Sequence, residues 1–205
     1  MPPRQSYHHG NLRQALVEAT VRLIEEKGPQ AFTLAEAARL AGVSAAAPYR
    51  HFTGREELLE EVARQGFEEF AGRLETAFDR GRPSPLSAFL RMGQEYLTFA
   101  AERRGFYMAM FESGISVTGN SGLTQAADRA RGVLVEASEA LFRRLPADRP
   151  RPPAGIVADH IWAMSHGVVE LFGRGKPGGR SPIQPADMLE SGALIYLRGL
   201  GVIPD

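Results

Sequence analysis

The chain has 205 residues, of which 43% are hydrophobic and 23% charged, with 24 basic and 24 acidic side chains and no cysteine. This composition is ordinary for one or two globular domains, and the lack of cysteine excludes disulfides, thiolate metal sites and a cysteine nucleophile. No apolar run approaches the roughly 18 residues that cross a bilayer, and residues 1–14 lack the apolar middle segment of a signal peptide. We therefore expect a cytoplasmic protein without a membrane partner.

The charge is unevenly distributed along the chain. Residues 1–55 hold seven basic and four acidic side chains, a net charge of +3, so the remainder carries −3. A positively charged N-terminal segment favours a polyanion such as nucleic acid as its partner.

Apolar residues spaced three and four apart predict helices along the whole chain. Gly28 ends the first helix, Thr33 and Glu36 have the spacing of a capping box at the start of the second, and Thr53 and Glu56 repeat this spacing. No strand-like alternation occurs, so the expected fold class is all-α with about nine helices. The predicted helices span 11–27, 33–41, 45–51, 55–80, 86–102, 104–112, 122–145, 153–173 and 185–200.

The second and third predicted helices are separated by only three residues, Gly42, Val43 and Ser44. Glycine suits the left-handed backbone position that ends a helix, and two short helices around such a turn match the helix-turn-helix pattern, whose second helix enters the major groove of DNA. Paired short helices also occur in proteins that never meet DNA, so the spacing alone leaves both interpretations open.

The side chains of residues 45–51 suit a DNA duplex. Ala45 and Ala46 let the backbone approach closely, and their methyl groups can touch thymine methyl groups. Arg50 can bond a phosphate or a guanine edge. Three further side chains are candidate phosphate contacts, namely Tyr49, His51 and Arg55.

The segment FTLAEAARLAGVSAAAPYRHFTGREELLEEVA, residues 32–63, resembles the helix-turn-helix domain of the tetracycline-repressor (TetR) family of bacterial transcription regulators. The shared features include Ala41-Gly42-Val43-Ser44, His51-Phe52 and a helix that opens with a basic residue followed by Glu-x-Leu. Pro48 departs from the commoner family pattern, which favours some readout of DNA shape. The resemblance implies phosphate contacts at Thr33, Ser44, Tyr49, His51 and Arg55, and base contacts at positions 45, 46 and 50.

The resemblance also implies a domain organisation. We expect a flexible arm at 1–9, which either reaches the DNA or is disordered, a helix-turn-helix domain at 10–56 and an effector-binding and dimerisation domain at 57–205. The last two long helices of each subunit would form a four-helix interface in a homodimer. Its small residues would be Ala158, Gly167, Ala193 and Gly199, and its apolar centre Ile195, Leu197 and Leu200. An intramolecular core would use the same side chains.

The segment IWAMSHGVVELF, residues 161–172, resembles the Trp-x-x-x-His-Gly signature of one C-terminal subgroup of the family. Trp162 and His166 share a helix face. His166 is either a polar contact for a ligand in a cavity or a packed histidine that is hydrogen-bonded to Trp162 or to a carbonyl. Aromatic and methionine residues can line an apolar pocket, although they are more often plain core. The candidate ligand-binding residues are Phe89, Tyr96, Phe106, Met110, Phe111, Trp162 and His166.

These features lead to one functional hypothesis by family analogy. The chain would be a repressor, released from a pseudo-palindromic double-stranded DNA operator when a small-molecule effector binds. A constitutive DNA-binding protein without a ligand and an activator remain as alternatives. An enzyme is not expected, because the sequence lacks a Gly-rich phosphate loop, a nucleophile elbow and metal-ligand spacing. We expect no cofactor and no metal.

Overall fold

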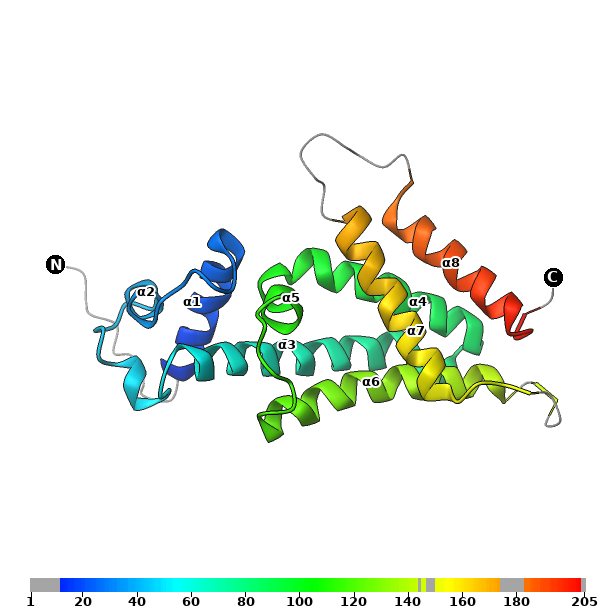
Figure 1. Cartoon of the computed structure of the whole chain (residues 1–205), viewed down its shortest axis with the longest axis horizontal. Helices are drawn as coiled ribbons and strands as arrows, with labels where there is room; N and C mark the ends of the chain where they lie inside the picture. The colour runs from blue at the N-terminus through cyan, green and yellow to red at the C-terminus, as the bar shows by residue number, and fades with distance from the viewer. Residues whose placement is uncertain (1–11, 144, 147–149, 174–182, 204–205) are drawn as a thin grey trace. The chain divides into compact units, whose positions relative to one another are not determined.

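The structure, a computed structural model, describes residues 12–143, 145–146, 150–173 and 183–203. This part of the chain consists of helices and turns without a strand, which confirms the predicted fold class (Figure 1). The predicted arm 1–9 lies outside the described residues. The eight α-helices are α1 (Leu12–Lys27), α2 (Leu34–Leu40), α3 (Arg55–Phe78), α4 (Pro85–Glu102), α5 (Arg104–Phe111), α6 (Ser121–Phe142), α7 (Ala154–Val168) and α8 (Pro185–Gly199).

The third predicted helix, at residues 45–51, is a tight turn instead. Only Pro48–Arg50 is helical, and it is a 3-10 turn in which the Arg50 N–H donates to the Ala47 carbonyl at 3.2 Å. Pro48 has no N–H for a bond to the residue four positions earlier, and its ring would clash with that carbonyl in an α-helix. We call residues 45–51 the recognition segment.

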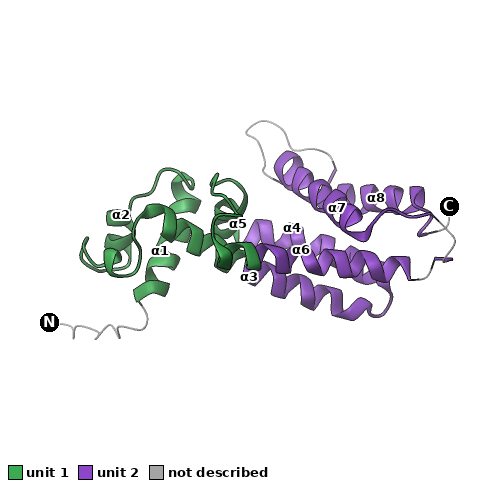
Figure 2. Cartoon of the chain, turned by 60° about the horizontal axis from the view of Figure 1, so that its bottom comes forward, with its two compact units in different colours: residues 1–67, 103–125 green, residues 68–102, 126–205 purple. Residues whose placement is uncertain are grey.

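The chain forms two compact units, each made of two stretches of sequence (Figure 2). Unit 1 comprises residues 1–67 and 103–125, and unit 2 comprises residues 68–102 and 126–205. One boundary between the units falls inside α3 and another inside α6. Unit 1 also contains α5, so it is larger than the segment 10–56 that carries the helix-turn-helix pattern.

In unit 1, α5 lies tightly against α1. A Cβ added to Gly105 would come within 2.6 Å of the Val21 carbonyl oxygen, and the Gly105 N–H donates to Glu25 Oε1 at 3.0 Å. Two phenylalanines, Phe32 and Phe52, are almost fully buried in the same unit. The core of unit 1 therefore combines the N-terminal helices with a helix from the middle of the chain.

Unit 2 is organised around an aromatic cluster. The ring of Phe70, which is 1% exposed, lies with its centroid 5.2 Å from Tyr96, 4.9 Å from Phe99 and 6.0 Å from Trp162. The contacts with Tyr96 and Trp162 have the edge-to-face geometry that aromatic rings favour. Two exposed ion pairs also join helices of this unit, Arg129–Glu75 at 2.7 Å and Arg131–Asp159 at 2.7 Å.

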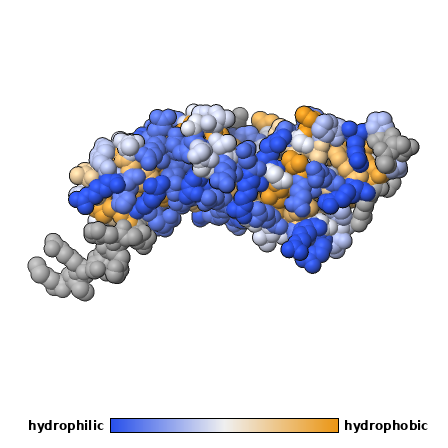
Figure 3. All heavy atoms as spheres, turned by 90° about the horizontal axis from the view of Figure 1, so that it is seen from below, coloured by the Kyte–Doolittle hydropathy of each residue, from blue (hydrophilic) through white to orange (hydrophobic). Residues whose placement is uncertain are grey.

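Hydrophilic side chains cover most of the face drawn in Figure 3, with smaller apolar patches among them. None of the helices in the described part of the chain is long and apolar enough to cross a bilayer.

Candidate nucleic-acid interface

The start of α2 has the predicted capping box. Thr33 Oγ1 accepts a hydrogen bond from the Glu36 N–H at 3.2 Å, and Glu36 Oε2 accepts one from the Thr33 N–H at 2.9 Å. Lys27 lies 2.5 Å from Glu36 Oε1. Hydrogen bonds from Lys27 and then from Thr33 lower the pKa of Glu36 from 4.5 to about 2. The box satisfies two backbone donors and sets where the chain enters α2.

The turn after α2 is a Schellman motif centred on Gly42. This residue has a φ of 73°, a left-handed conformation that glycine adopts without steric cost. The Gly42 N–H donates to the Arg39 carbonyl at 3.1 Å, and the Val43 N–H donates to the Ala38 carbonyl at 2.9 Å. These two bonds satisfy carbonyls at the helix end and define the motif. The prediction that Gly42 ends the helix in this conformation is confirmed.

The recognition segment presents most of its side chains to solvent. Pro48 and Phe52 are buried and anchor it, whereas Tyr49 is 63% exposed. Leu40, at the end of α2, is 46% exposed, and the sequence analysis did not single it out. Six of the predicted DNA contacts are exposed and two are partly buried: Thr33, Ser44, Ala45, Ala46, Tyr49 and Arg50 in the first group, His51 and Arg55 in the second.

Arg55 makes contacts inside unit 1, which differs from the phosphate contact that the sequence suggested. Its Nε–H donates to the Phe32 carbonyl at 3.1 Å, and its guanidinium lies 4.7 Å from the centroid of the Phe32 ring. It also donates to the Pro29 carbonyl and to the Gln30 side chain. Because backbone carbonyls that leave water need donors, Arg55 holds the first turn of α3 against the loop that precedes α2.

The start of α3 differs by one residue from the predicted capping box. Thr53 pairs with Glu57, whose Oε2 accepts from the Thr53 N–H at 2.7 Å and from Thr53 Oγ1 at 2.8 Å. The predicted partner Glu56 is wrong, because α3 begins at Arg55 and its third residue is therefore Glu57. These hydrogen bonds from Thr53 lower the pKa of Glu57.

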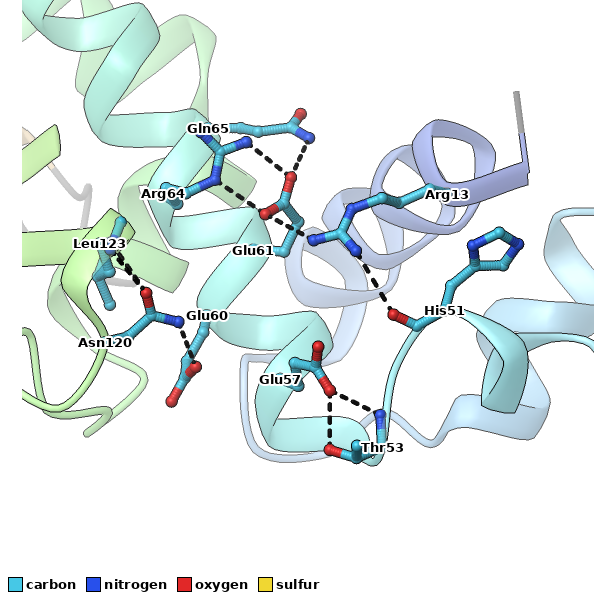
Figure 4. Close-up of polar contacts among 11 residues, drawn as sticks. Arg13, His51, Thr53, Glu57, Glu60, Glu61, Arg64, Gln65, Asn120 and Leu123 are labelled. Atoms are coloured by element: carbon cyan, nitrogen blue, oxygen red, sulfur yellow. Dashed lines mark hydrogen bonds and ion pairs between the residues drawn. The ribbon is translucent and has the colours of Figure 1, made fainter. Parts of the chain in front are cut away.

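A second arginine, Arg13, contacts the end of the recognition segment and was not singled out in the sequence. Its guanidinium donates to the His51 carbonyl at 3.4 Å and lies 3.0 Å from Glu61 Oε2 (Figure 4). It also stacks 4.7 Å above the centroid of the Phe52 ring. The spacing of Glu61 and Arg64 on α3 is a signal that predicts their pairing, but no local pattern predicts the third partner from α1.

The predicted effector residues are divided between the two units. Phe106, Met110 and Phe111 belong to unit 1, where a Cβ on Gly66 would come within 2.8 Å of Met110 Sδ and the rings of Phe67 and Phe111 meet at 5.5 Å. Phe106 and Met110 are buried there. These three side chains therefore contribute to the core of unit 1, which is the alternative to a ligand pocket that the sequence left open.

The other four predicted effector residues belong to unit 2. Tyr96 Oη lies 3.4 Å from His166 Nδ1, and the Tyr96 ring meets that of Trp162 at 6.4 Å. His166 thus lies within hydrogen-bond distance of a tyrosine on α4. Phe89 lines a small apolar hollow between α4, α7 and α8, with about 20 Å³ of space inside, which is room for about one water molecule. The hollow is also lined by Gly93, Leu97, Ile161, Ser165, Leu189 and Ala193.

The outer surfaces of α7 and α8 carry exposed apolar side chains. Ala193 and Leu197 are buried within unit 2, so these two side chains belong to an intramolecular core, the alternative to a dimer interface that the sequence left open. Ile195, in contrast, is 69% exposed. Single exposed apolar residues are ordinary, but a group on neighbouring helices indicates an interaction surface. Four large apolar residues of this region are exposed: Ile156, Leu171, Ile183 and Ile195. Within the described part of the chain, no cluster of three or more acidic or histidine side chains is arranged to hold a metal ion.

Two family models match the chain. "Bacterial regulatory proteins, tetR family" matches residues 16–62, and "Tetracyclin repressor-like, C-terminal domain" matches residues 89–193, which is half of the chain. No curated protein matches it.

Several solved structures resemble the whole fold. A protein of unknown function from Rhodococcus sp. RHA1 is 26% identical, with a TM-score of 0.80 over 96% of this chain and 99% of its own. PfmR, a TetR family transcriptional regulator from Thermus thermophilus, is 21% identical, with a TM-score of 0.68 over 90% and 98%. AibR, in complex with isovaleryl coenzyme A and operator DNA, is 16% identical, with a TM-score of 0.66 over 90% and 97%. With its helix-turn-helix geometry and both family models matched, this chain belongs to the tetR family of bacterial regulatory proteins and is a DNA-binding transcriptional regulator.

Proposed function

We propose that this regulator is a homodimeric repressor, released from a pseudo-palindromic operator when a small molecule binds in its C-terminal domain. The observation that carries the DNA-binding part is the exposed recognition segment that follows the Gly42 turn. Had residues 45–51 been covered by neighbouring chain, no groove could admit them. We retain 10–56 as the DNA-binding domain and 57–205 as the effector and dimerisation domain, acting in the cytoplasm.

The proposed contacts divide by chemistry. Hydroxyl and imidazole groups would position the protein on phosphates, and the side chains of Ala45, Ala46 and Arg50 would touch bases. Arg50 is the one guanidinium on the recognition segment, so hydrogen-bond readout there is limited to about one base pair. The alanine methyl groups favour thymine at the neighbouring positions. The proposed phosphate contacts are Thr33, Ser44, Tyr49, His51 and Arg55, of which Arg55 also donates to backbone carbonyls of unit 1.

Dimerisation would place two recognition segments on successive major grooves, about 34–36 Å apart. Two apolar side chains support a four-helix interface there: Leu171, in the helical turn Val169–Gly173 that follows α7, and Ile195 on α8, each 69% exposed. Ile195→Glu should convert the dimer to a monomer in analytical ultracentrifugation. An unchanged dimer would move the interface to another surface.

The effector would be a small, largely apolar molecule that opens the hollow beside Phe89 in unit 2. Buried Ser165, with Gln94 and Glu190, supplies the polar groups that line the hollow. The Trp162-x-x-x-His166-Gly167 signature supports membership of that C-terminal subgroup. AibR, a relative in fold, is solved in complex with isovaleryl coenzyme A, but that ligand is large and highly charged, so short acyl compounds such as isovalerate suit the apolar hollow better as first compounds to test. Because the hollow has room for about one water molecule, an effector must displace the side chains that line it; a regulator that needs no ligand is the alternative.

A mobility-shift titration against the DNA that flanks the gene for this protein tests the proposal. Specific binding that weakens steeply between two salt concentrations is expected, because phosphate contacts release counterions. A compound that raises the melting temperature of the protein and weakens this complex would support the repressor. A compound that raises the melting temperature without changing DNA affinity would favour the constitutive regulator.

A further inference from the structure

The recognition segment has little secondary structure of its own to hold it. Its helical part is the three-residue turn Pro48–Arg50, closed by bonds between residues three apart. Such turns have poorer hydrogen-bond geometry than an α-helix and seldom extend far. The orientation of the segment relative to α1 and α3 must therefore come from buried Pro48 and from contacts at the ends of the segment.

One end of the segment is held by Arg13 of α1. The guanidinium donates to the His51 carbonyl, which is the last carbonyl of the segment, and covers the ring of Phe52, which follows it. The same guanidinium lies 3.0 Å from Glu61 on α3. Figure 4 shows Arg13 reaching from α1 between the His51 carbonyl and the Glu61 carboxylate. A single side chain thus joins three elements of unit 1.

Glu61 is built to hold this arginine. Its side chain is 8% exposed, Arg64 donates to both of its carboxylate oxygens at 2.8 Å, and Gln65 donates to Oε1 at 2.8 Å. A charged carboxylate that is removed from water needs such partners. Glu61 therefore stays ionised, with its Oε2 presented to Arg13 in a fixed place.

We propose that Arg13 and Glu61 are positioning residues for DNA recognition. Arg13, locked by Glu61, holds the His51 carbonyl and the Phe52 ring, and so keeps the recognition segment in the orientation that enters the groove. Without this lock the segment would occupy several orientations, and the apparent affinity for DNA falls in proportion to the competent fraction. The inference rests on the proposed DNA-binding function and adds to it two residues that need not touch DNA.

The competing interpretation is that Arg13, whose side chain is 46% exposed, binds a phosphate directly. The two interpretations predict opposite signs for Glu61→Gln. Removing a negative charge strengthens the general attraction to a polyanion, and it would free Arg13 for a phosphate. If Arg13 instead positions the recognition segment, Glu61→Gln removes the carboxylate that holds Arg13 in place and so weakens specific binding to DNA.

The experiment compares Glu61→Gln with Glu56→Gln, an exposed glutamate on the same helix that changes the charge equally. The probes are the duplex that the wild-type protein selects from a random-sequence library and poly(dI-dC) as non-specific DNA. We expect Glu61→Gln to lose about tenfold in affinity for the selected duplex, on the scale of coupled side chains. Glu56→Gln should bind it as tightly as the wild type or more tightly. Binding of both variants to poly(dI-dC) should not fall.

Arg13→Gln and the double variant complete the test. The double variant should bind the selected duplex no more weakly than Arg13→Gln alone, because the two residues act as one unit. The slope of log affinity against log salt should be the same for Arg13→Gln and wild type, whereas a lost phosphate contact lowers it by about 0.9. A Glu61→Gln variant that binds as tightly as Glu56→Gln, or a lowered slope for Arg13→Gln, overturns the inference. Failure of the wild type to select any duplex overturns the proposed function instead.

Discussion

The two units of this chain differ in how their functional residues are placed. In unit 1, the recognition segment lies between a capping box at Thr33, a glycine turn at Gly42 and a buried Phe52, so local signals and a few anchors present it to solvent. In unit 2, the Tyr96–His166 pair and the aromatic cluster around Phe70 exist only through packing between helices far apart in the chain. A surface that reads DNA can be carried by short motifs, whereas an effector site depends on the core that surrounds it.

The largest expected effect is a loss of stability in a variant of α5, which tests whether this helix belongs to the core that supports the recognition segment. Gly105→Ala should lower the free energy of unfolding by about 1–3 kcal/mol, because its Cβ would lie 2.6 Å from the Val21 carbonyl oxygen. Urea denaturation measures the change. The control is Gly132→Ala, exposed within α6 with no atom within 4 Å of the added Cβ, which should raise stability by about 0.5–1 kcal/mol. Equal stability of the two variants would contradict the tight contact between α5 and α1.

The next largest expected effect is on operator binding, and it follows from removing Arg50, the single guanidinium of the recognition segment. Arg50→Ala should weaken operator binding and relax the preference for one base pair by about 1–3 kcal/mol, because the bidentate contact to guanine is lost. Competition assays with operators changed at single positions measure this preference. A uniform loss of affinity on every sequence would show that Arg50 contacts only a phosphate.

Acid should weaken the anchor of the recognition segment. Burial raises the pKa of Glu61, but hydrogen bonds from Arg64, Gln65 and Arg13 outweigh it and lower that pKa from 4.5 to about 2. The stability contributed by Glu61 is therefore present above pH 4.5 and is lost as the pH falls toward 2, by an amount on the order of 1 kcal/mol. Glu61→Gln should show a smaller loss of stability over this range in thermal denaturation. Parallel curves for variant and wild type would contradict the lowered pKa.

The smallest effect concerns the exposed alanines. Replacing thymine by deoxyuridine at the operator positions that face Ala45 and Ala46 should cost about 0.8 kcal/mol per methyl group, because an apolar contact is lost. Fluorescence anisotropy with matched duplexes resolves such a change. Ala45→Gly should bind the two duplexes alike at the position it faces. Unchanged wild-type affinity at every thymine would assign specificity to DNA shape.

The helix-turn-helix was predictable from the sequence because its determinants are local. The Thr33 and Glu36 partners are three residues apart. At the end of α2, the Gly42 N–H bonds a carbonyl three residues back and the Val43 N–H bonds one five residues back. The exposure of Ala45, Ala46, Tyr49 and Arg50 also followed from their polar or small character around a buried Pro48. The recognition segment was nevertheless predicted as a full helix, because the cost of Pro48 in its middle was underestimated.

The sequence by itself determined the all-helical fold, the order of its helices, the glycine turn and the family. Tertiary structure alone decided which groups Arg13, Arg55 and His166 contact, and it placed α5 in unit 1. The physical reason is distance along the chain: Arg13 and His51 are 38 positions apart, and Gly105 and Glu25 are 80 apart. Periodicity and capping report bonds within one turn of a helix, so which charge or ring a side chain meets across the core is decided only when the chain folds.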